Sequence, residues 1–170
     1  MNKILIVGSP GSGKSTLAKI LGDKLNLKTV YLDTFYWKAG WIVRDHEEYL
    51  KLEEEALLCD KWVIDGNYRS TLEKRLSYAD TVIFLDYKRW VCIYSIFKRY
   101  FKYKKKERDS MTKGCFEKID KAFFLWAWRF NKNIKPLIYQ QINSCQDIDL
   151  LIFKNRRNLN RFIKTLDSHK

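Results

Sequence analysis

The chain has 170 residues, of which 46% are hydrophobic, and a formal net charge of +13. This length suits one domain with a single core, and the hydrophobic content excludes an intrinsically disordered chain. The positive charge favours anionic partners such as nucleic acid, an anionic membrane surface or nucleotide phosphates. We therefore expect a single domain over residues 1–170.

Five short apolar runs are typical of strands in a parallel sheet that is covered on both faces. They are Ile4–Val7, Thr29–Leu32, Trp62–Ile64, Thr81–Leu85 and Asp149–Phe153. Helical patterns lie between them. These cover residues 15–25, 45–59 with Asp45 as N-cap, 69–78, a long helix from Lys88, 117–142 with Pro136 as a kink or break, and 156–166. The alternation predicts an α/β fold whose ligands bind at the carboxyl ends of the strands.

Targeting and membrane segments are not expected. The apolar run 122–128 is much shorter than a membrane span, and the run 4–7 leads directly into a glycine-rich turn. The four cysteines form no C-x-x-C pair, so we expect neither structural zinc nor disulfides. We predict a cytoplasmic protein without a membrane partner, and the oligomeric state is left open.

The strongest motif follows the first strand and matches G-x-x-x-x-G-K-[ST] without mismatch. Its residues are Gly8, Ser9, Pro10, Gly11, Ser12, Gly13, Lys14 and Ser15, followed by Thr16. The glycines permit positive φ, and the backbone N–H groups and the helix N-terminus can then surround a phosphate. Lys14 would bridge the β- and γ-phosphates, Ser15 would bind Mg²⁺, and Thr16 would contact the α-phosphate. The motif predicts ATP and Mg²⁺ as cofactors.

A phosphate-binding loop by itself fits a kinase, an ATPase, a GTPase or a motor. An N-K-x-D-type motif for guanine recognition is missing from the sequence, which argues against a GTPase. The chain is also short for a motor core with its coupling elements. These features favour a small-molecule kinase.

Further motifs resemble the adenylate-kinase-like P-loop proteins of the DNA topology modulation (FlaR-like) family. The resemblance is carried by GSPGSGKSTLA at 8–18, LDxFYWxxGW at 32–41, WVIDGNYRSTLxxRL at 62–76, ADTVIFLD at 79–86, Arg89-Trp90, RY at 99–100 and RDSMTKGCFEK at 108–118. It implies a likeness to nucleotide and shikimate-type kinases. The implied fold is a three-layer α/β/α P-loop domain with a five-stranded parallel sheet of order 2-3-1-4-5 and a helical lid. The family label implies a DNA-linked phenotype but no particular biochemical activity.

Two aspartates follow strands and are candidate site residues. In related small kinases an acid at the position of Asp33 holds or deprotonates the acceptor hydroxyl, although a turn or cap role is the alternative. Asp65 could hold Mg²⁺ through water, with Asn67, Tyr68 and Arg69 then facing the acceptor. Phe35, Tyr36, Trp37 and Trp41 could stack on a ring or belong to the core.

Residues 98–118 are basic and occupy the position of the lid in adenylate-kinase-like proteins. We expect Arg99 and Arg108 to contact the transferring phosphoryl group, because a guanidinium binds phosphate through two N–H groups. Lys104–Lys106 are expected to be solvated. Arg156, after the last strand, is a candidate for stacking on the adenine, with a surface salt bridge as the alternative.

The sequence predicts a P-loop phosphotransferase that moves the γ-phosphoryl group of Mg-ATP to a small acceptor. A nucleotide, a nucleoside or another hydroxyl compound would fit. The alternative is an ATP-dependent nucleic-acid-binding protein linked to DNA topology, because aromatic and basic residues interleave from Arg99 to Lys106.

Overall fold

The computed structural model of the chain describes residues 1–145 and 147–166. Helices and strands alternate along it. The elements are β1 (Lys3–Gly8), α1 (Lys14–Leu25), β2 (Lys28–Tyr31), α2 (Leu32–Tyr36), β3 (Trp37–Lys38), β4 (Ile42–Val43), α3 (His46–Leu57), β5 (Trp62–Asp65), α4 (Leu72–Tyr78), β6 (Thr81–Leu85), α5 (Arg89–Tyr103), α6 (Lys121–Asn133), α7 (Lys135–Asn143), β7 (Asp149–Phe153) and α8 (Arg156–Thr165). Short 3-10 turns cover Ala39–Trp41 and Arg69–Thr71.

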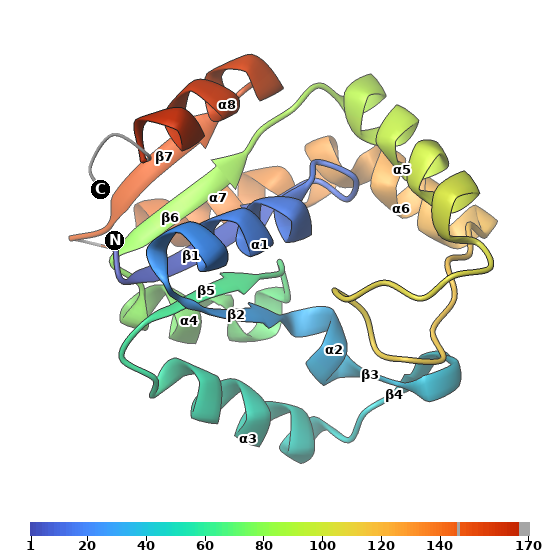
Figure 1. Cartoon of the computed structure of the whole chain (residues 1–170), viewed down its shortest axis with the longest axis horizontal. Helices are drawn as coiled ribbons and strands as arrows, with labels where there is room; N and C mark the ends of the chain where they lie inside the picture. The colour runs from blue at the N-terminus through green and yellow to red at the C-terminus, as the bar shows by residue number, and fades with distance from the viewer. Residues whose placement is uncertain (146, 167–170) are drawn as a thin grey trace.

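The main sheet has five parallel strands in the order β2-β5-β1-β6-β7 (Figure 1). Numbered among themselves, these strands have the predicted order 2-3-1-4-5. The element labels differ because β3 and β4 form a separate antiparallel pair that we did not expect. The register aligns Tyr31 with Asp65 and Gly8 with Leu85, so these strand ends lie at one edge of the sheet.

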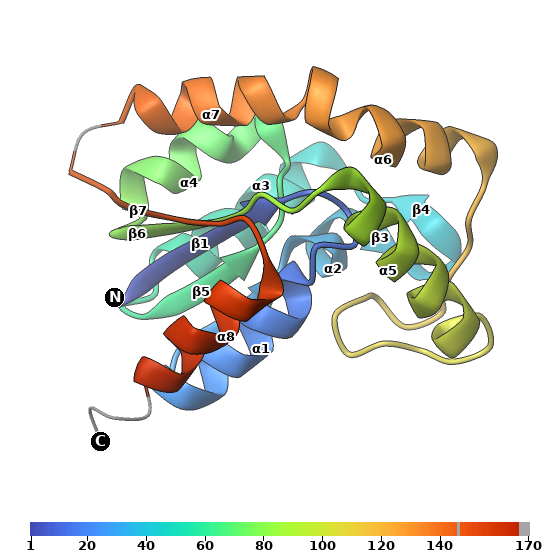
Figure 2. The same cartoon turned by 90° about the horizontal axis from the view of Figure 1, so that it is seen from above.

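Both faces of the sheet are buried, which explains the continuous apolar strands. Successive side chains of β1 alternate between two cores. Leu5 and Val7 pack with α3, α4 and α7, whereas Ile4 and Ile6 pack with α1 and α8. Figure 2 shows these two helical layers on opposite sides of the sheet. The three-layer α/β/α architecture is therefore confirmed.

Local sequence signals explain several helix ends. Asp45 accepts hydrogen bonds from the backbone N–H groups of Glu47 and Glu48, which confirms it as the N-cap of α3. Pro136 lies in the first turn of α7, where a missing backbone N–H costs little, so the helical segment is divided into α6 and α7 at this point. In the part of the chain that the structure describes, no helix combines the length and apolarity needed to cross a bilayer.

The lid that we expected over residues 98–118 is helical only in its first part, which belongs to α5. Helix α5 ends at Tyr103, and residues 104–120 form turns and loop rather than helix. The polar groups of this segment bond to another part of the chain. Thr112 Oγ1 donates to the Trp37 carbonyl at 2.6 Å, and Trp41 Nε1 donates to the Phe116 carbonyl at 3.0 Å. These contacts hold the segment against the β3–β4 pair.

Candidate active site

The phosphate-binding loop joins β1 to α1 and has the backbone that its glycines suggested. Gly8, Gly11 and Gly13 have φ values of 146°, 78° and 98°, which side chains strongly disfavour. A Cβ on Gly11 would lie 2.4 Å from the Cys92 carbonyl oxygen, so the missing side chain also lets the loop approach α5. Lys14 Nζ donates to the carbonyls of Gly8 (3.1 Å) and Ser9 (3.2 Å).

Asn67 anchors the first glycine of this loop. Its Oδ1 accepts from the Gly8 N–H at 3.0 Å, and its Nδ2 donates to the Gly8 carbonyl at 2.9 Å. Both hydrogen-bonding groups of the glycine's peptide backbone are thus held by one side chain from the loop after β5. The sequence suggested that Asn67 faces the acceptor; Asn67 does line the cavity, and its amide also fixes the phosphate-binding loop.

A short hydrogen bond joins Ser15 and Asp65 in the site. Ser15 Oγ donates to Asp65 Oδ2 at 2.6 Å. Asp65 is buried, and its Oδ1 has no hydrogen-bond partner among the described residues. Burial raises the pKa of Asp65, while nearby Lys14 and the Ser15 hydroxyl oppose that rise. A buried carboxylate oxygen without a partner, next to a serine hydroxyl, is a fitting ligand set for a hard cation.

The described residues contain no cluster of three or more histidine, cysteine or carboxylate side chains that could enclose a metal. A Mg²⁺ site of the P-loop kind does not need such a cluster. Such a site uses one or two protein ligands and completes its coordination with water and substrate phosphates.

Asp33 lies in the first turn of α2 and is held by Tyr68. The Tyr68 hydroxyl donates to Asp33 Oδ1 at 2.8 Å. Burial is the main cause that raises the pKa of Tyr68, and the Asp33 carboxylate adds to it, so the phenol stays protonated as a donor. The negative charge of Asp33 also raises the pKa of Asp65, so the two carboxylates interact electrostatically.

The aromatic residues near Asp33 divide between core and cavity. Phe35 packs against the main core, whereas Tyr36, Trp37 and Trp41 line the cavity. The ring centroids of Tyr36 and Tyr68 are 4.9 Å apart, and those of Trp37 and Trp41 are 5.4 Å apart. The cavity therefore has an aromatic wall on the Asp33 side.

A buried ion pair stabilises the backbone of Tyr68, the residue that binds Asp33. Arg75 and Glu53 are 0% and 1% exposed and contact each other. Glu53 Oε1 also accepts from Tyr49 OH and Thr71 Oγ1, and Arg75 Nη2 donates to the Tyr68 carbonyl at 2.8 Å. The pair therefore connects α3 and α4 to the residue that holds Asp33.

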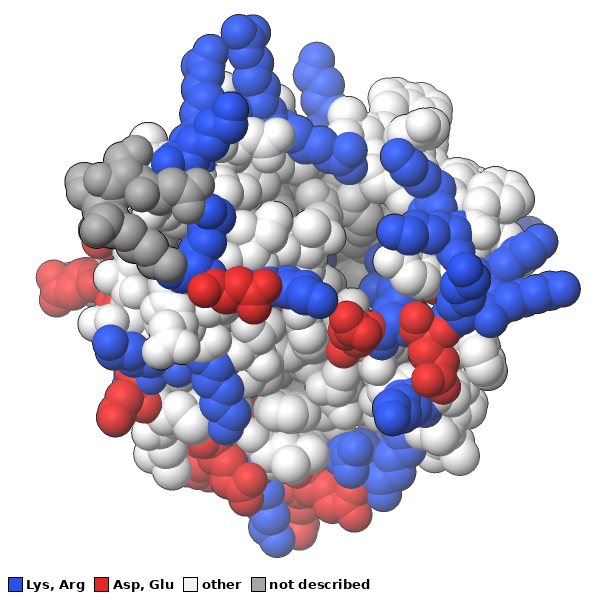
Figure 3. Space-filling model, in the orientation of Figure 1, with Lys and Arg blue, Asp and Glu red and all other residues white. Residues whose placement is uncertain are grey.

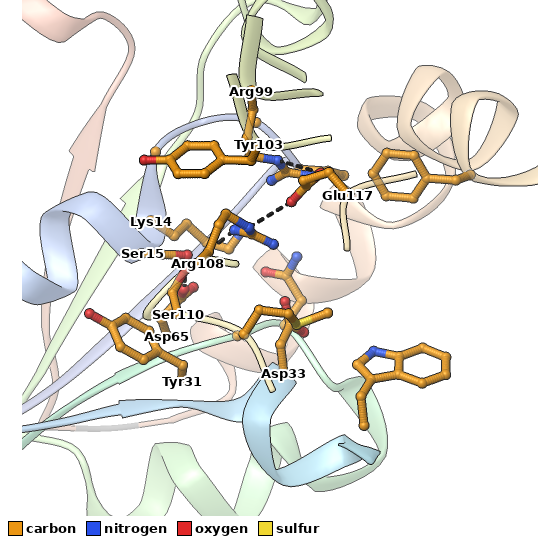
Figure 4. A pocket seen from close by; sticks show the side chains of 18 of the residues that line it. Lys14, Ser15, Tyr31, Asp33, Asp65, Arg99, Tyr103, Arg108, Ser110 and Glu117 are labelled. Carbon is orange, nitrogen blue, oxygen red and sulfur yellow. Dashed lines mark hydrogen bonds and ion pairs between the residues drawn. The ribbon is translucent and has the colours of Figure 1, made fainter. Parts of the chain in front are cut away.

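The two predicted arginines meet at Glu117, which sequence reasoning had not singled out. Arg99 Nε donates to Glu117 Oε2 at 3.1 Å, and Arg108 Nε is paired with Glu117 Oε1 at 2.6 Å. In Figure 4 the Arg108 side chain lies between Glu117 and the side of the cavity that holds Lys14, Ser15 and Asp65. The only signal for Glu117 in the sequence is an acid within a basic segment.

One cavity of about 1150 Å³ brings most of the candidate residues together. Its lining includes Pro10, Gly11, Gly13, Lys14, Ser15, Thr16, Asp33, Asp65, Arg99, Arg108 and Arg156. Gly8, Ser9 and Ser12 lie outside the lining, and Ser9 Oγ instead donates to Asn131 Oδ1 on α6. Arg156 Nη2 donates to Ser95 Oγ at 2.7 Å, which ties the start of α8 to α5.

Basic side chains gather around this cavity. Figure 3 shows Lys and Arg over α8 and over the end of α5 with the loop that follows, and the surface between these groups is hollowed. Lys14 and Arg108 both lower the pKa of Asp65, which lines this cavity. The arrangement can bind a polyphosphate and a cation together.

Comparisons with known proteins agree with this architecture. The chain is 37% identical over 84 residues to a cytidylate kinase from Sulfolobus acidocaldarius, a match that covers 48% of this chain and 42% of that protein. The chain thus spans less than half the length of this curated relative.

Solved structures share the fold over nearly the whole chain. A shikimate kinase from Bacteroides thetaiotaomicron has a TM-score of 0.57 and 18% identity, with 97% of this chain and 96% of that chain covered. A deoxyadenosine kinase from M. mycoides, solved with dATP, has a TM-score of 0.57 and 15% identity, with 98% and 97% covered. The fold is that of P-loop kinases. No family model matches the chain, so membership of the topology modulation family is not confirmed.

Proposed function

We propose that this protein is an ATP-dependent small-molecule kinase that transfers the γ-phosphoryl group of Mg-ATP to a hydroxyl of a small acceptor. The observation that carries the proposal is the contact between Ser15 and the buried Asp65 beside Lys14. Asp33 and two arginines line the same cavity. The likeness to a cytidylate kinase over 84 residues supports phosphoryl transfer to a small acceptor.

Ser15 and Asp65 would hold Mg²⁺, directly or through water. When bound, the cation neutralises charge between the β- and γ-phosphates. Lys14 would leave the loop carbonyls and bind the phosphates, while Arg99 and Arg108 would approach the equatorial oxygens of the transferring group. Asn67 would keep the loop in place. Arg156, which lines the cavity and donates to Ser95 on α5, would contact the base or ribose.

Asp33 would receive the acceptor hydroxyl. Tyr68 fixes one of its oxygens, which orients the carboxylate toward the cavity. A carboxylate in this place attracts a hydroxyl donor and repels a phosphate, so an alcohol acceptor fits better than a phosphate acceptor. The aromatic wall of Tyr36, Trp37 and Trp41 favours an acceptor with a flat ring. A nucleoside combines both features.

An acceptor panel tests the proposal. ADP release from Mg-ATP is measured with nucleosides, nucleoside monophosphates and small hydroxy-acids, and with single-stranded and duplex DNA in the same series. Stimulation by one small acceptor, together with a phosphorylated product, is expected. Stimulation by DNA alone would refute the kinase assignment and favour the nucleic-acid alternative, which the likeness to small-molecule kinases does not favour.

Asp33→Asn is expected to spare ATP binding and to lower transfer to the acceptor by about 10²–10⁴-fold, the usual contribution of a positioned acid or base. The amide keeps the shape but loses the charge that attracts the acceptor proton. Transfer and nucleotide affinity are measured on the same preparation. Asp60→Asn is the matched control, because Asp60 is exposed at a turn before β5. Full transferase activity in Asp33→Asn would contradict the proposed role of Asp33 in binding the acceptor hydroxyl.

Ser15→Ala is expected to raise the Mg²⁺ concentration needed for half-maximal turnover by about 10–100-fold. The variant removes one oxygen of the ligand pair and the donor that orients Asp65. Turnover is followed across a Mg²⁺ series at fixed ATP. Ser77→Ala, on the exposed side of α4, should leave the Mg²⁺ series unchanged. An unchanged series in Ser15→Ala would contradict the assigned cation site.

A further inference from the structure

Glu117 contacts both arginines of the site although it comes from the far end of the loop that follows α5. Its side chain is 4% exposed, whereas those of Arg99 and Arg108 are 29% and 13% exposed. Arg99 lies 18 residues before it and Arg108 nine residues before it. One buried carboxylate thus joins a helix residue and a loop residue.

Each arginine meets Glu117 through its Nε atom. This leaves the Nη groups at the end of each guanidinium available for other partners. Arg108 Nη1 makes a long contact of 3.3 Å with Ser110 Oγ. Figure 4 shows the Arg108 guanidinium on the side of Glu117 that faces Lys14 and Asp65. Glu117 therefore binds each guanidinium on its Nε side and leaves the Nη side toward the cavity.

Two guanidinium groups repel each other unless an anion lies between them. Burial is the main cause that lowers the pKa of Arg108, Arg99 lowers it further, and Glu117 raises it. The carboxylate of Glu117 therefore offsets part of both costs, and two positive groups with one negative group leave a formal charge of +1 facing the cavity. A phosphoryl group in transfer needs cations in this position.

We propose that Glu117 is a positioning residue that binds the Nε atoms of Arg99 and Arg108 and so directs their Nη groups toward the transferring phosphoryl group. The inference rests on the proposed kinase function. Glu117 also lines the cavity, but the proposed role needs no contact between Glu117 and the substrate. It acts through the arginines, whose orientation would otherwise be lost to mutual repulsion and to side-chain freedom.

The test compares the wild type with Glu117→Gln and Glu117→Asp. The amide can accept from one Nε but presents an N–H group to the other, so kcat should fall by about 10²-fold, as for loss of one stabilising donor. KM for Mg-ATP should change by less than about threefold, because the arginines act mainly in the transition state. Glu117→Asp keeps the charge and should recover about tenfold of the lost kcat.

Glu54→Gln is the matched control, since it removes a carboxylate from an exposed ion pair with Lys74 on the other side of the molecule. A second readout needs no acceptor: the affinity for Mg-ADP with and without aluminium fluoride, a mimic of the transferring group. Aluminium fluoride should tighten ADP binding to the wild type and much less to Glu117→Gln, with ADP affinity alone unchanged. In an Arg108→Ala background, Glu117→Gln should lower kcat by a much smaller factor than it does in the wild type.

The outcomes are separable. A wild-type kcat in Glu117→Gln, or a higher one, would overturn the inference, and the higher value would mean that Glu117 competes with phosphate for the arginines. A loss that adds fully to that of Arg108→Ala would also overturn it, because it would show a purely structural role. If Glu117→Gln does not fold, Glu117→Asp decides: lowered kcat at constant KM supports the inference, and wild-type kcat overturns it.

A wild-type protein that shows neither transfer to any acceptor nor tighter ADP binding with aluminium fluoride would overturn the proposed function, and this inference with it. An active wild type with an indifferent Glu117 would overturn the inference alone.

Discussion

Lys14→Ala is expected to lower Mg-ATP turnover by about 10³-fold or more, which is the scale of losing a cation that stabilises the transferring phosphoryl group. In this structure the Lys14 ammonium bonds to the carbonyls of Gly8 and Ser9 and lowers the pKa of the buried Asp65. The group thus lies between the phosphate-binding loop and the cation ligands, where the β- and γ-phosphates would bind. Alanine leaves that position without positive charge.

The fold should survive this change. Lys14 occupies the first position of α1 and its polar contacts are to the loop itself, so the two cores of the sheet are untouched. Turnover and thermal unfolding are measured together, with Lys74→Ala as control because the Lys74 side chain forms an exposed ion pair with Glu54, between α4 and α3. Unchanged turnover in folded Lys14→Ala would refute the assignment of the phosphate-binding loop.

Glu53→Ala is expected to lower the free energy of unfolding by about 3–5 kcal/mol, the cost of leaving one member of a buried ion pair alone. Arg75 would lose its carboxylate while remaining 0% exposed. Tyr49 and Thr71 would lose the acceptor that they share. This loss is a large share of the stability of an ordinary domain, so the variant should be close to unfolding at moderate temperature.

Urea unfolding measures the effect. An unchanged slope of the unfolding free energy against urea concentration would show that the variant exposes the same surface area on unfolding as the wild type. Glu54→Gln, next along α3, should cost about 0–1 kcal/mol because its pair with Lys74 is exposed. A loss below about 1 kcal/mol in Glu53→Ala would show that the buried pair is not needed for stability. Since Arg75 also holds the Tyr68 backbone, transfer to the acceptor should weaken in parallel.

Much of the fold could be predicted because its signals are local. The strand runs 4–7, 62–64, 81–85 and 149–153 are apolar on both faces, and each lies in an observed strand. Asp45 and Pro136 mark helix boundaries through their own backbone chemistry. The predicted strand 29–32 is shifted by one residue, because β2 covers Lys28–Tyr31 and Leu32 begins α2. The order of the sheet came from the family resemblance rather than from periodicity.

The loop 104–120 shows where local signals end. Its basic residues suggested a helical lid, but its side chains and carbonyls bond to the β3–β4 pair about 75 residues away in the sequence. Loops have no repeating pattern, so neither Trp41 nor Phe116 indicates its partner. The predicted arginines Arg99 and Arg108 do lie in one cavity with Lys14, but Glu117 between them was not foreseen.

By itself, the sequence determined the phosphate-binding loop, because Gly8, Gly11 and Gly13 adopt positive φ at little cost and need no partner to do so. It also determined that one acid, Asp65, ends β5 and that another, Asp33, comes shortly after β2. The tertiary structure decided what these residues touch: Asn67 on Gly8, Tyr68 on Asp33, and Glu117 on two arginines. Local rules reach only a few residues along the chain, whereas each of these contacts depends on which strands are neighbours and which way their loops turn.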